Sequence, residues 1–216
     1  MKLKPIFLER TQPLTLFPSI QGLFWVVKLR DIDNAEARQA QDFLDQATKE
    51  YLSELNFEED KKRAFVTHAA LQFYLNDYLQ ETPCIRRNIF GKPYLTGGQL
   101  QFNLSHAKDW AFFGFHVLPI GVDIESIHTP LIEDFWVKAS EKQLLADLPL
   151  IYLWCAKEAL LKGEGTGFSG SLPVFNKVRH LNNDAHLFEA GTKQVWVYPN
   201  QIDQHVLAIC IHEEHQ

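Results

Sequence analysis

Apolar residues follow two different spacings in the early part of the chain. Residues 20–29 form a mostly apolar run that is typical of a strand. In residues 34–47 the apolar side chains recur at helical spacing, which predicts a helix with one buried stripe. That stripe consists of Ala37, Ala40, Phe43, Leu44 and Ala47.

A longer helix is predicted for residues 57–79. Asn56 precedes it in the position of an N-cap, Glu59 follows as in a capping box, and Pro83 lies beyond its end. The second turn of this helix carries the basic residues Lys61, Lys62 and Arg63. Such a run usually forms a solvated face, and it indicates phosphate binding only when other residues do so too.

The middle and the end of the chain predict further strands. Residues 110–117 and 120–125 are apolar strands joined by Leu118 and Pro119, and we expect them to form a hairpin. Residues 174–211 are also rich in strand-forming residues. Because both halves contain helical and β-rich stretches, the pattern is compatible with an α+β protein that has two similar subdomains.

The stretch from Trp154 to Gly167 combines helical spacing with charges that a core helix avoids. Trp154, Glu158 and Lys162 recur every four residues and therefore lie on one face of a helix. Glycines at 163, 165 and 167 favour the end of that helix, since glycine tolerates the positive φ of a helix C-terminus. This face is either a solvated one with a Glu-to-Lys pair or part of a site.

Two carboxylates lie close together about thirty residues upstream. In the strand Gly121-Val122-Asp123-Ile124-Glu125, alternation places Asp123 and Glu125 on one face with Gly121. The strand is either an edge strand with one wet face or part of a divalent metal site. Mg²⁺ fits best, since it takes one or two protein carboxylates together with water and substrate phosphates.

Two polar stretches lie between these elements and the long helix. They are Gly91-Lys92-Pro93 and Asn103-Leu104-Ser105-His106. Lysine, serine and histidine can all donate hydrogen bonds to a phosphate, so phosphate is a plausible common target. Taken singly, however, the first stretch is better explained as a hairpin tip and the second as a capped loop.

Composition narrows the choice of partners. The 216 residues carry a formal net charge of −6, and the excess acid is C-terminal, which argues against nucleic acid as a partner. No apolar run reaches the ~20 residues that span a bilayer, and the first residues show no export signal. Three widely spaced cysteines fit reduced thiols. We therefore expect a cytoplasmic protein without a membrane or nucleic-acid partner.

Four motifs occur in a fixed order along the chain. They are Gly91-Lys92-Pro93, Asn103-Leu104-Ser105-His106, Gly121-Val122-Asp123-Ile124-Glu125 and the run from Trp154 to Lys162. Together they resemble the motif set of 4′-phosphopantetheinyl transferases of the monomeric type that activates peptide and polyketide synthetases. The run from Glu59 to Arg63 resembles the acidic-basic segment upstream in that family. Residues 1–50 and 175–216 match the family only in general character.

The resemblance implies an α+β fold made of two similar α/β subdomains related by a pseudo-twofold axis. Residues 1–118 would form the N-terminal subdomain and residues 119–216 the C-terminal one, with coenzyme A and Mg²⁺ or Mn²⁺ in the cleft between them. The implied enzyme is a holo-carrier-protein synthase. It moves the phosphopantetheine arm of coenzyme A to a serine of an acyl or peptidyl carrier protein, in fatty acid or nonribosomal peptide synthesis, and releases adenosine 3′,5′-bisphosphate.

The resemblance also implies roles for individual residues. Asp123 and Glu125 would hold the metal, and Glu158 would be either a third ligand or the general base. Lys162 would contact the pyrophosphate, and Lys157 would help to orient the helix or the nucleotide. The residues implied to bind the 3′-phosphate and the adenine region are Arg63, Lys92, Pro93, Ser105 and His106.

The sequence departs from the family in one respect, and two other functions stay open. Thr48 and Tyr51 stand where family members often carry basic residues. Because carrier proteins are usually acidic and this chain is acidic too, docking is expected to use apolar residues within 127–136. The alternatives are a metal-dependent phosphohydrolase acting on coenzyme A or nucleotides, and a non-catalytic module that binds coenzyme A.

Overall fold

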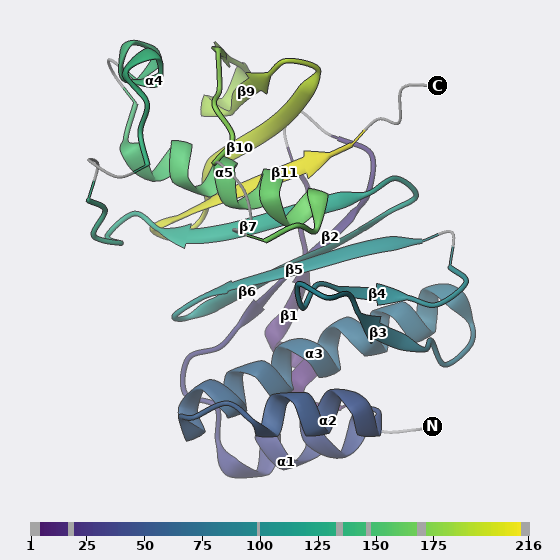
Figure 1. Ribbon diagram of the computed structural model, residues 1–216. Coiled ribbons are helices and arrows are strands. Elements are labelled where there is room, and N and C mark those ends of the chain that lie inside the picture. Colours follow the sequence, from purple (N-terminus) through teal and green to yellow (C-terminus); the bar gives the residue numbers. More distant parts are fainter. Residues whose placement is uncertain are drawn as a thin grey trace.

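The computed structural model describes residues 5–16, 20–98, 100–132, 136–145, 148–167 and 172–212. Within these ranges the chain forms a mixed α/β structure of two halves that lie one above the other (Figure 1). None of the described helices is both long enough and apolar enough to cross a bilayer.

The N-terminal half consists of a sheet covered by helices on one face. Its helices are the short 3-10 helix η1 (Ile6–Arg10) and the α-helices α1 (Asn34–Phe43), α2 (Gln46–Ser53) and α3 (Glu58–Leu79). Its strands are β1 (Thr11–Pro13), β2 (Leu23–Lys28), β5 (Gln101–Ala107) and β6 (Trp110–His116), and the order in the sheet is β1-β2-β6-β5. A separate two-stranded hairpin is formed by β3 (Ile85–Arg87) and β4 (Pro93–Leu95).

The single helix predicted for residues 34–47 is two helices. The side chain of Asp33 caps α1, which ends at Phe43. Asp45 then accepts a hydrogen bond from the Thr48 backbone and starts α2, so Ala47 is exposed instead of buried. Two acidic caps a short distance apart therefore override the continuous apolar spacing.

Helix α3 confirms the long helix predicted from the sequence but not its cap. The residue in the N-cap position is Phe57, one residue after the predicted Asn56, and its side chain makes no capping hydrogen bond. The helix ends at Leu79, and the following residue, Gln80, caps it in a left-handed conformation with φ of 57°.

In the described residues, the C-terminal half contains a five-stranded antiparallel sheet, two α-helices and a short 3-10 helix. Its elements are β7 (Ile120–Ser126), α4 (Ala139–Leu144), α5 (Leu150–Glu164), β8 (Lys177–His180), η3 (Asn182–Asp184), β9 (His186–Ala190), β10 (Lys193–Ile202) and β11 (His205–Ile211). The strand order is β7-β11-β10-β9-β8, which confirms the β-rich end of the chain.

The hairpin predicted between residues 110–117 and 120–125 is wrong. Strand β6 pairs with β2 and β5, whereas β7 pairs with β11, so the chain passes from one sheet to the other between these strands. A hydrogen bond joins the two sheets: the side chain of Asn103 in β5 accepts it from the Val122 backbone in β7 at 2.8 Å. The two strands that carry the predicted site residues therefore lie side by side.

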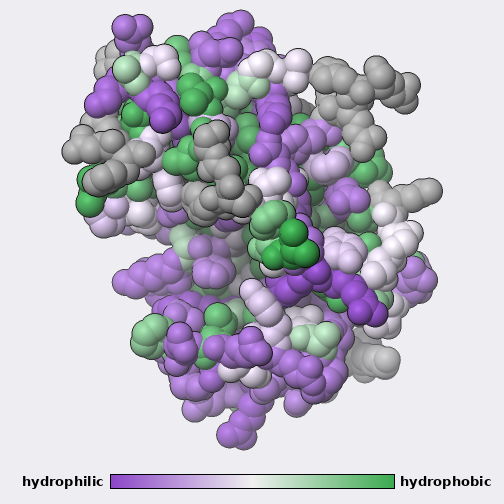
Figure 2. Space-filling view, viewed as in Figure 1, coloured by the Kyte–Doolittle hydropathy of each residue, from purple (hydrophilic) through white to green (hydrophobic). Residues whose placement is uncertain are grey.

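The packing produces four layers, visible from bottom to top in Figure 1. Helices α1 to α3 pack on one face of the first sheet, and the other face of that sheet packs on the second sheet. Helix α5 covers the outer face of the second sheet. The lower part of the face shown in Figure 2, over the helical layer, is largely hydrophilic, as expected when the apolar side chains are buried between layers.

The two sheets share a local strand order. In the first sheet β2 pairs with β6, and β6 pairs with β5; in the second, β7 pairs with β11, and β11 pairs with β10. In each case a strand is followed by helices and then by a hairpin whose second strand returns to pair with the first.

Candidate functional site

Helix α5 carries the polar row that was predicted from helical spacing. Glu158 and Lys162 both line a pocket at the boundary between the two halves of the molecule. The helix ends at Glu164, and Gly165 adopts a φ of +70° while its backbone N–H donates to the carbonyl of Leu161 at 2.9 Å. The predicted glycine stop is therefore confirmed, although Gly163 still lies within the helix.

A close backbone contact fixes α5 on β7. A side-chain carbon at Gly121 would lie 2.0 Å from the Ala159 carbonyl oxygen and 2.2 Å from the Gly163 nitrogen. Val122 and Ile124 face the other way, into the core between the sheets. The predicted alternation of β7 is thus confirmed, and it turns Asp123 toward the helix.

Asp123 lies at the centre of a hydrogen-bonded network. It is 2% exposed, and its Oδ1 accepts hydrogen bonds from the Lys162 ammonium at 2.6 Å and from the Ser105 hydroxyl at 2.7 Å. The same ammonium donates to the Ser105 oxygen at 2.8 Å. The other carboxylate oxygen, Oδ2, is buried and accepts no hydrogen bond from the described residues. A buried carboxylate oxygen without a partner is costly, so this atom has unused capacity for a cation.

Two further carboxylates lie close enough to Asp123 for its charge to act on them. Glu125 accepts hydrogen bonds from the Trp154 indole at 3.1 Å and from the Thr129 hydroxyl at 3.3 Å. Burial and the charge of Asp123 raise the pKa of Glu125. Burial also raises the pKa of Glu158 to about 7, and Lys162 opposes this shift while Asp123 and Glu125 add to it.

The donor set fits a hard divalent cation. Asp123, with one buried oxygen unpaired, lies beside two carboxylates whose pKa values are raised, and Mg²⁺ would neutralise this negative charge. In the ranges that the structure describes, no group of three His, Cys, Asp or Glu side chains already has ligating geometry. In this structure the positive charge beside Asp123 is the ammonium of Lys162.

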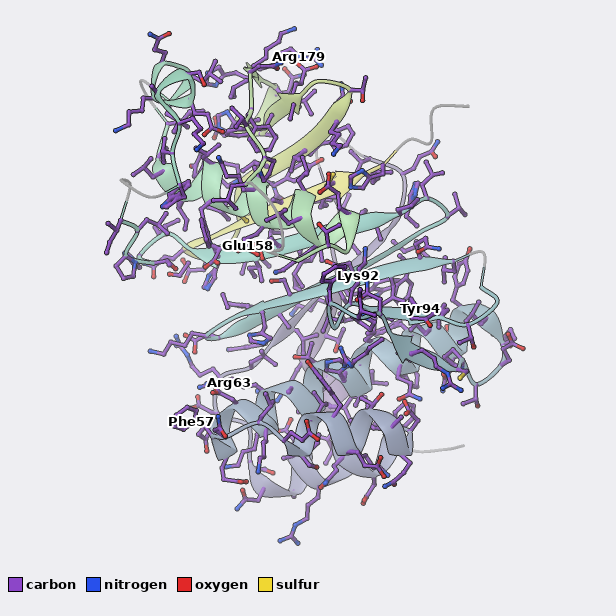
Figure 3. All side chains as sticks on the ribbon, in the orientation of Figure 1. Phe57, Arg63, Lys92, Tyr94, Glu158 and Arg179 are labelled. Carbon is purple, nitrogen blue, oxygen red and sulfur yellow. The ribbon has the colours of Figure 1, made fainter. Side chains whose placement is uncertain are left out.

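The pocket beside this network has a volume of about 270 Å³. Three segments of the chain line it, with the following residues: Phe90, Gly91, Lys92 and Pro93; Asn103 and Leu104; and Glu158, Leu161, Lys162, Gly165 and Gly167. Figure 3 shows Lys92 and Glu158 on opposite sides of the boundary between the two halves. The geometry therefore offers a largely apolar recess that is also lined by two lysines, Lys92 and Lys162, and by the carboxylate of Glu158.

Comparison with known proteins agrees with this arrangement. A model of the 4′-phosphopantetheinyl transferase superfamily matches residues 119–210, which include Asp123, Glu125, Glu158 and Lys162. The C-terminal half of the chain is thus similar to the 4′-phosphopantetheinyl transferase superfamily.

Three relatives illustrate how far this similarity extends. The 4′-phosphopantetheinyl transferase Sfp of Bacillus subtilis is 31% identical over 108 residues, which are 45% of this chain and 48% of that protein. The transferase ffp of Bacillus subtilis is 26% identical over 164 residues, 70% of this chain and 73% of that protein. The transferase gsp of Aneurinibacillus migulanus is 28% identical over 123 residues, half of each chain. The chain spans about half the length of Sfp and of gsp.

The remaining predicted residues lie at different distances from the network around Asp123. Pro93 is buried in the pocket wall, and Ser105 is part of the network. His106 is exposed, and partial desolvation and the nearby Lys162 lower its pKa. Arg63 lies on the helical layer, where it pairs with Asp60 at 3.2 Å (Figure 3). The ammonium of Lys92 donates to backbone carbonyls of the C-terminal half.

The structure does not bring Lys157 to this site. Its ammonium lies in the core of the C-terminal half, where it donates to Glu141 at 2.8 Å and to the Trp136 carbonyl at 3.2 Å. Both members of this ion pair are almost completely buried. Lys157 was predicted to orient either the helix or the nucleotide, and the second role is corrected: its charge is already paired inside the protein, and solvent does not reach it. The pair with Glu141 is compatible with the first role, because it ties helix α5 to α4.

Sequence reasoning missed a second pocket on the N-terminal half. It has a volume of about 500 Å³ and lies between α2 and β3, where the guanidinium of Arg87 stacks 3.6 Å from the centre of the Tyr51 ring. Thr48 and Arg86 also line it. Its only sequence signal was the pair of arginines just before the Gly91-Lys92-Pro93 motif.

Proposed function

We propose that this protein transfers the 4′-phosphopantetheine arm of coenzyme A to a serine of an acyl or peptidyl carrier protein. The observation that carries the proposal is that Asp123, Glu158 and Lys162 lie together beside one pocket, in a chain whose residues 119–210 match the model of this superfamily. In the reaction, the serine oxygen forms a bond to the β-phosphorus of coenzyme A. The bond from that phosphorus to the bridging oxygen breaks, and adenosine 3′,5′-bisphosphate leaves.

Asp123, Glu125 and Glu158 would hold a divalent cation, Mg²⁺ or Mn²⁺. A bound cation of this kind supplies charge neutralisation at a pyrophosphate. The unpaired Oδ2 of Asp123 and the raised pKa values of Glu125 and Glu158 support this role, since each reflects negative charge that lacks a sufficient partner.

Glu158 is the group that we assign to take the proton of the attacking serine. Its pKa of about 7 places it near the point where a carboxylate both accepts a proton readily and is available in its charged form. It also lines the pocket, so a serine hydroxyl that enters the pocket can approach it. A role as a third metal ligand is the alternative for this residue.

Lys162 would contact the pyrophosphate, because its half-buried ammonium faces both the pocket and Asp123. Ser105 and His106 on β5 lie next to it and would bind the nucleotide end of coenzyme A, with Arg63 further along the same side. After burial, the charges of Lys162 and Arg63 both lower the pKa of His106, and this proximity supports the grouping.

The two halves of the chain would have different roles in the reaction. We propose that residues 1–118 and residues 119–216 are subdomains related by a pseudo-twofold axis, with substrate in the cleft between them. The shared strand order of the two sheets supports this relationship. Residues of both halves would contact coenzyme A, and the groups that take part in the reaction would lie in the second half.

The carrier protein is expected to dock on residues 127–136, of which 133–135 lie outside the described residues. Ile127 and Ile132 are 45% and 70% exposed and support an apolar contact, whereas Trp136 is buried and is unsuited to one. We also infer that the protein works as a monomer in the cytoplasm, in fatty acid or peptide synthesis; its three free cysteines are compatible with a reducing compartment.

Mass spectrometry of apo-carrier proteins provides the test. After incubation with the protein, coenzyme A and Mg²⁺, a substrate carrier should gain the mass of one phosphopantetheine, and a Ser→Ala change at its acceptor should abolish the gain. Reactions without a carrier control for other activities. Turnover of coenzyme A or nucleotides without any carrier would instead indicate a phosphohydrolase, and tight binding without turnover would indicate a binding module.

A further inference from the structure

Two histidines face each other at one end of the second sheet. His180 in β8 and His186 in β9 are directly opposed in the antiparallel register, so their side chains lie on the same face of the sheet. Their ring centroids are 4.9 Å apart, and the ring planes cross at 76°. Beyond this pair the chain turns, and the Leu181 backbone N–H donates to the Ala185 carbonyl at 2.7 Å. The backbone therefore holds the two imidazoles side by side.

The two rings differ in their contact with solvent. His180 is exposed, whereas His186 is only 6% exposed. The Nδ1 atom of His186 is buried and makes no hydrogen bond with any of the described residues. A buried imidazole nitrogen without a partner is costly, because it has lost its contact with water and gained no other. This nitrogen therefore has unused capacity to bind a ligand.

The surroundings of His186 favour its neutral form and place a carboxylate nearby. Burial lowers the pKa of His186, His180 lowers it further, and Asp184 opposes both effects. Tyr152, in the first turn of α5, packs on the same ring with a centroid distance of 5.3 Å. Burial and then the charge of Asp184 raise the pKa of this tyrosine, so the carboxylate acts on both rings. Neutral imidazole is the form that coordinates a metal, and a nearby negative charge attracts a cation.

We propose that His180 and His186 bind a nitrogen-preferring divalent ion of the Zn²⁺ type, at a site separate from the carboxylates around Asp123. Imidazole nitrogen suits Zn²⁺, Ni²⁺ and Cu²⁺, whereas Mg²⁺ prefers oxygen ligands. In the described part of the chain no third His, Cys, Asp or Glu side chain completes the set, so water fills the remaining positions. The ion gives the buried nitrogen of His186 a partner.

The position of the pair keeps this site apart from the proposed reaction. Figure 3 labels Arg179, the residue before His180, near the top of the view, whereas Glu158 lies at the boundary between the two halves. None of the described residues that line the pocket beside Asp123 belongs to β8 or β9. The metal site can therefore be judged whether or not a carrier protein is modified.

Titration with Zn²⁺ in excess Mg²⁺ tests the site, because Mg²⁺ occupies oxygen ligands and leaves the imidazoles free. His180→Ala should weaken the binding of Zn²⁺ at least about tenfold, since even the loss of a hydrogen-bond partner of a ligand costs ~10–100-fold in metal affinity. This variant removes an exposed side chain, so the fold should survive. His128→Ala is the matched control: it removes another exposed histidine of the same half, outside the pair, and should leave the affinity unchanged.

Electron paramagnetic resonance of the protein loaded with Cu²⁺ identifies the ligands. Nitrogen couplings from both imidazoles should appear in the wild type, and His180→Ala and His186→Gln should each lose one of them. Should His186→Gln fail to fold, His180→Ala alone decides the outcome. Equal Zn²⁺ affinity in the wild type and His180→Ala, or a Cu²⁺ spectrum that this change leaves as it is, would mean that the two rings only pack on each other and would overturn the proposal.

Discussion

Gly121 and Gly163 place the backbones of β7 and α5 in direct contact. A side-chain carbon at either position would enter occupied space: at Gly121 it would meet the helix backbone, and at Gly163 it would lie 2.5 Å from the His212 ring. Since Asp123 follows Gly121 by two residues and Glu158 precedes Gly163 by five, this contact fixes how far the carboxylates of strand and helix lie from one another.

Gly121→Ala should therefore destabilise the protein and misplace the site. The clash is with backbone atoms, which cannot rotate away, so a loss of about 3 kcal/mol is expected, at the upper end for overpacking. Chemical denaturation measures the loss. Gly97→Ala is the control, because it adds a methyl group in open space at a φ of +70° and should cost only the ~1–2 kcal/mol of a left-handed residue. Equal losses for the two variants would mean that α5 can shift freely.

Asp123 and Glu125 should respond differently to neutralisation although both are assigned to the metal. Asp123→Asn removes the charged partner of Lys162, so the free energy of unfolding should fall by about 1.5–3 kcal/mol. Glu125→Gln keeps an oxygen that can accept from Trp154 and removes a charge that burial already disfavours, so stability should hold or rise. Melts at pH 8 without divalent ions measure this difference.

Both variants should nevertheless lose at least ~10²-fold in the rate of carrier modification. If either carboxylate can be neutralised without loss of rate at saturating Mg²⁺, its assignment as a metal ligand is wrong. Wild-type protein assayed with a chelator and then with Mg²⁺ restored serves as the reference for both.

The residues that form this site illustrate what local sequence patterns can and cannot predict. Strand alternation placed Asp123 correctly, and helical spacing placed Glu158 and Lys162 on one face, because both periods are properties of the backbone. The partner of β7 was missed, since β11 lies far along the chain and no short-range pattern records that pairing. Lys92 could not be placed either, because its partners are backbone carbonyls, which every residue carries.

Glu158 should make stability depend on pH in metal-free buffer. Its pKa is raised from 4.5 to about 7 in the folded protein, so the folded state binds this proton more tightly than the unfolded state does. The stabilisation is complete below pH 4.5 and is lost as the pH rises toward 7. The Glu158→Gln variant cannot titrate, so its advantage over wild type should grow by ~1–2 kcal/mol across this range, allowing for solvent screening.

The same variant distinguishes the two roles assigned to Glu158. As the base, its loss should slow carrier modification by ~10²–10⁴-fold while coenzyme A affinity is nearly kept. A parallel loss of Mg²⁺ and coenzyme A affinity would favour the ligand role instead. A flat difference in stability between pH 4.5 and 7 would contradict the raised pKa itself.

The buried pair of Lys157 and Glu141 should matter for folding and not for coenzyme A. Lys157→Met leaves the Glu141 carboxylate buried without its cation, although the Phe175 backbone still donates to it at 2.9 Å. Breaking such a pair costs about 3–5 kcal/mol, whereas replacing both members costs much less. The double variant Lys157→Met with Glu141→Gln should therefore be more stable than Lys157→Met alone. Because the pair lies outside the pocket, the folded double variant should bind coenzyme A as tightly as wild type. Calorimetry on that variant checks this, and a tenfold or larger loss of affinity would restore Lys157 to the substrate site.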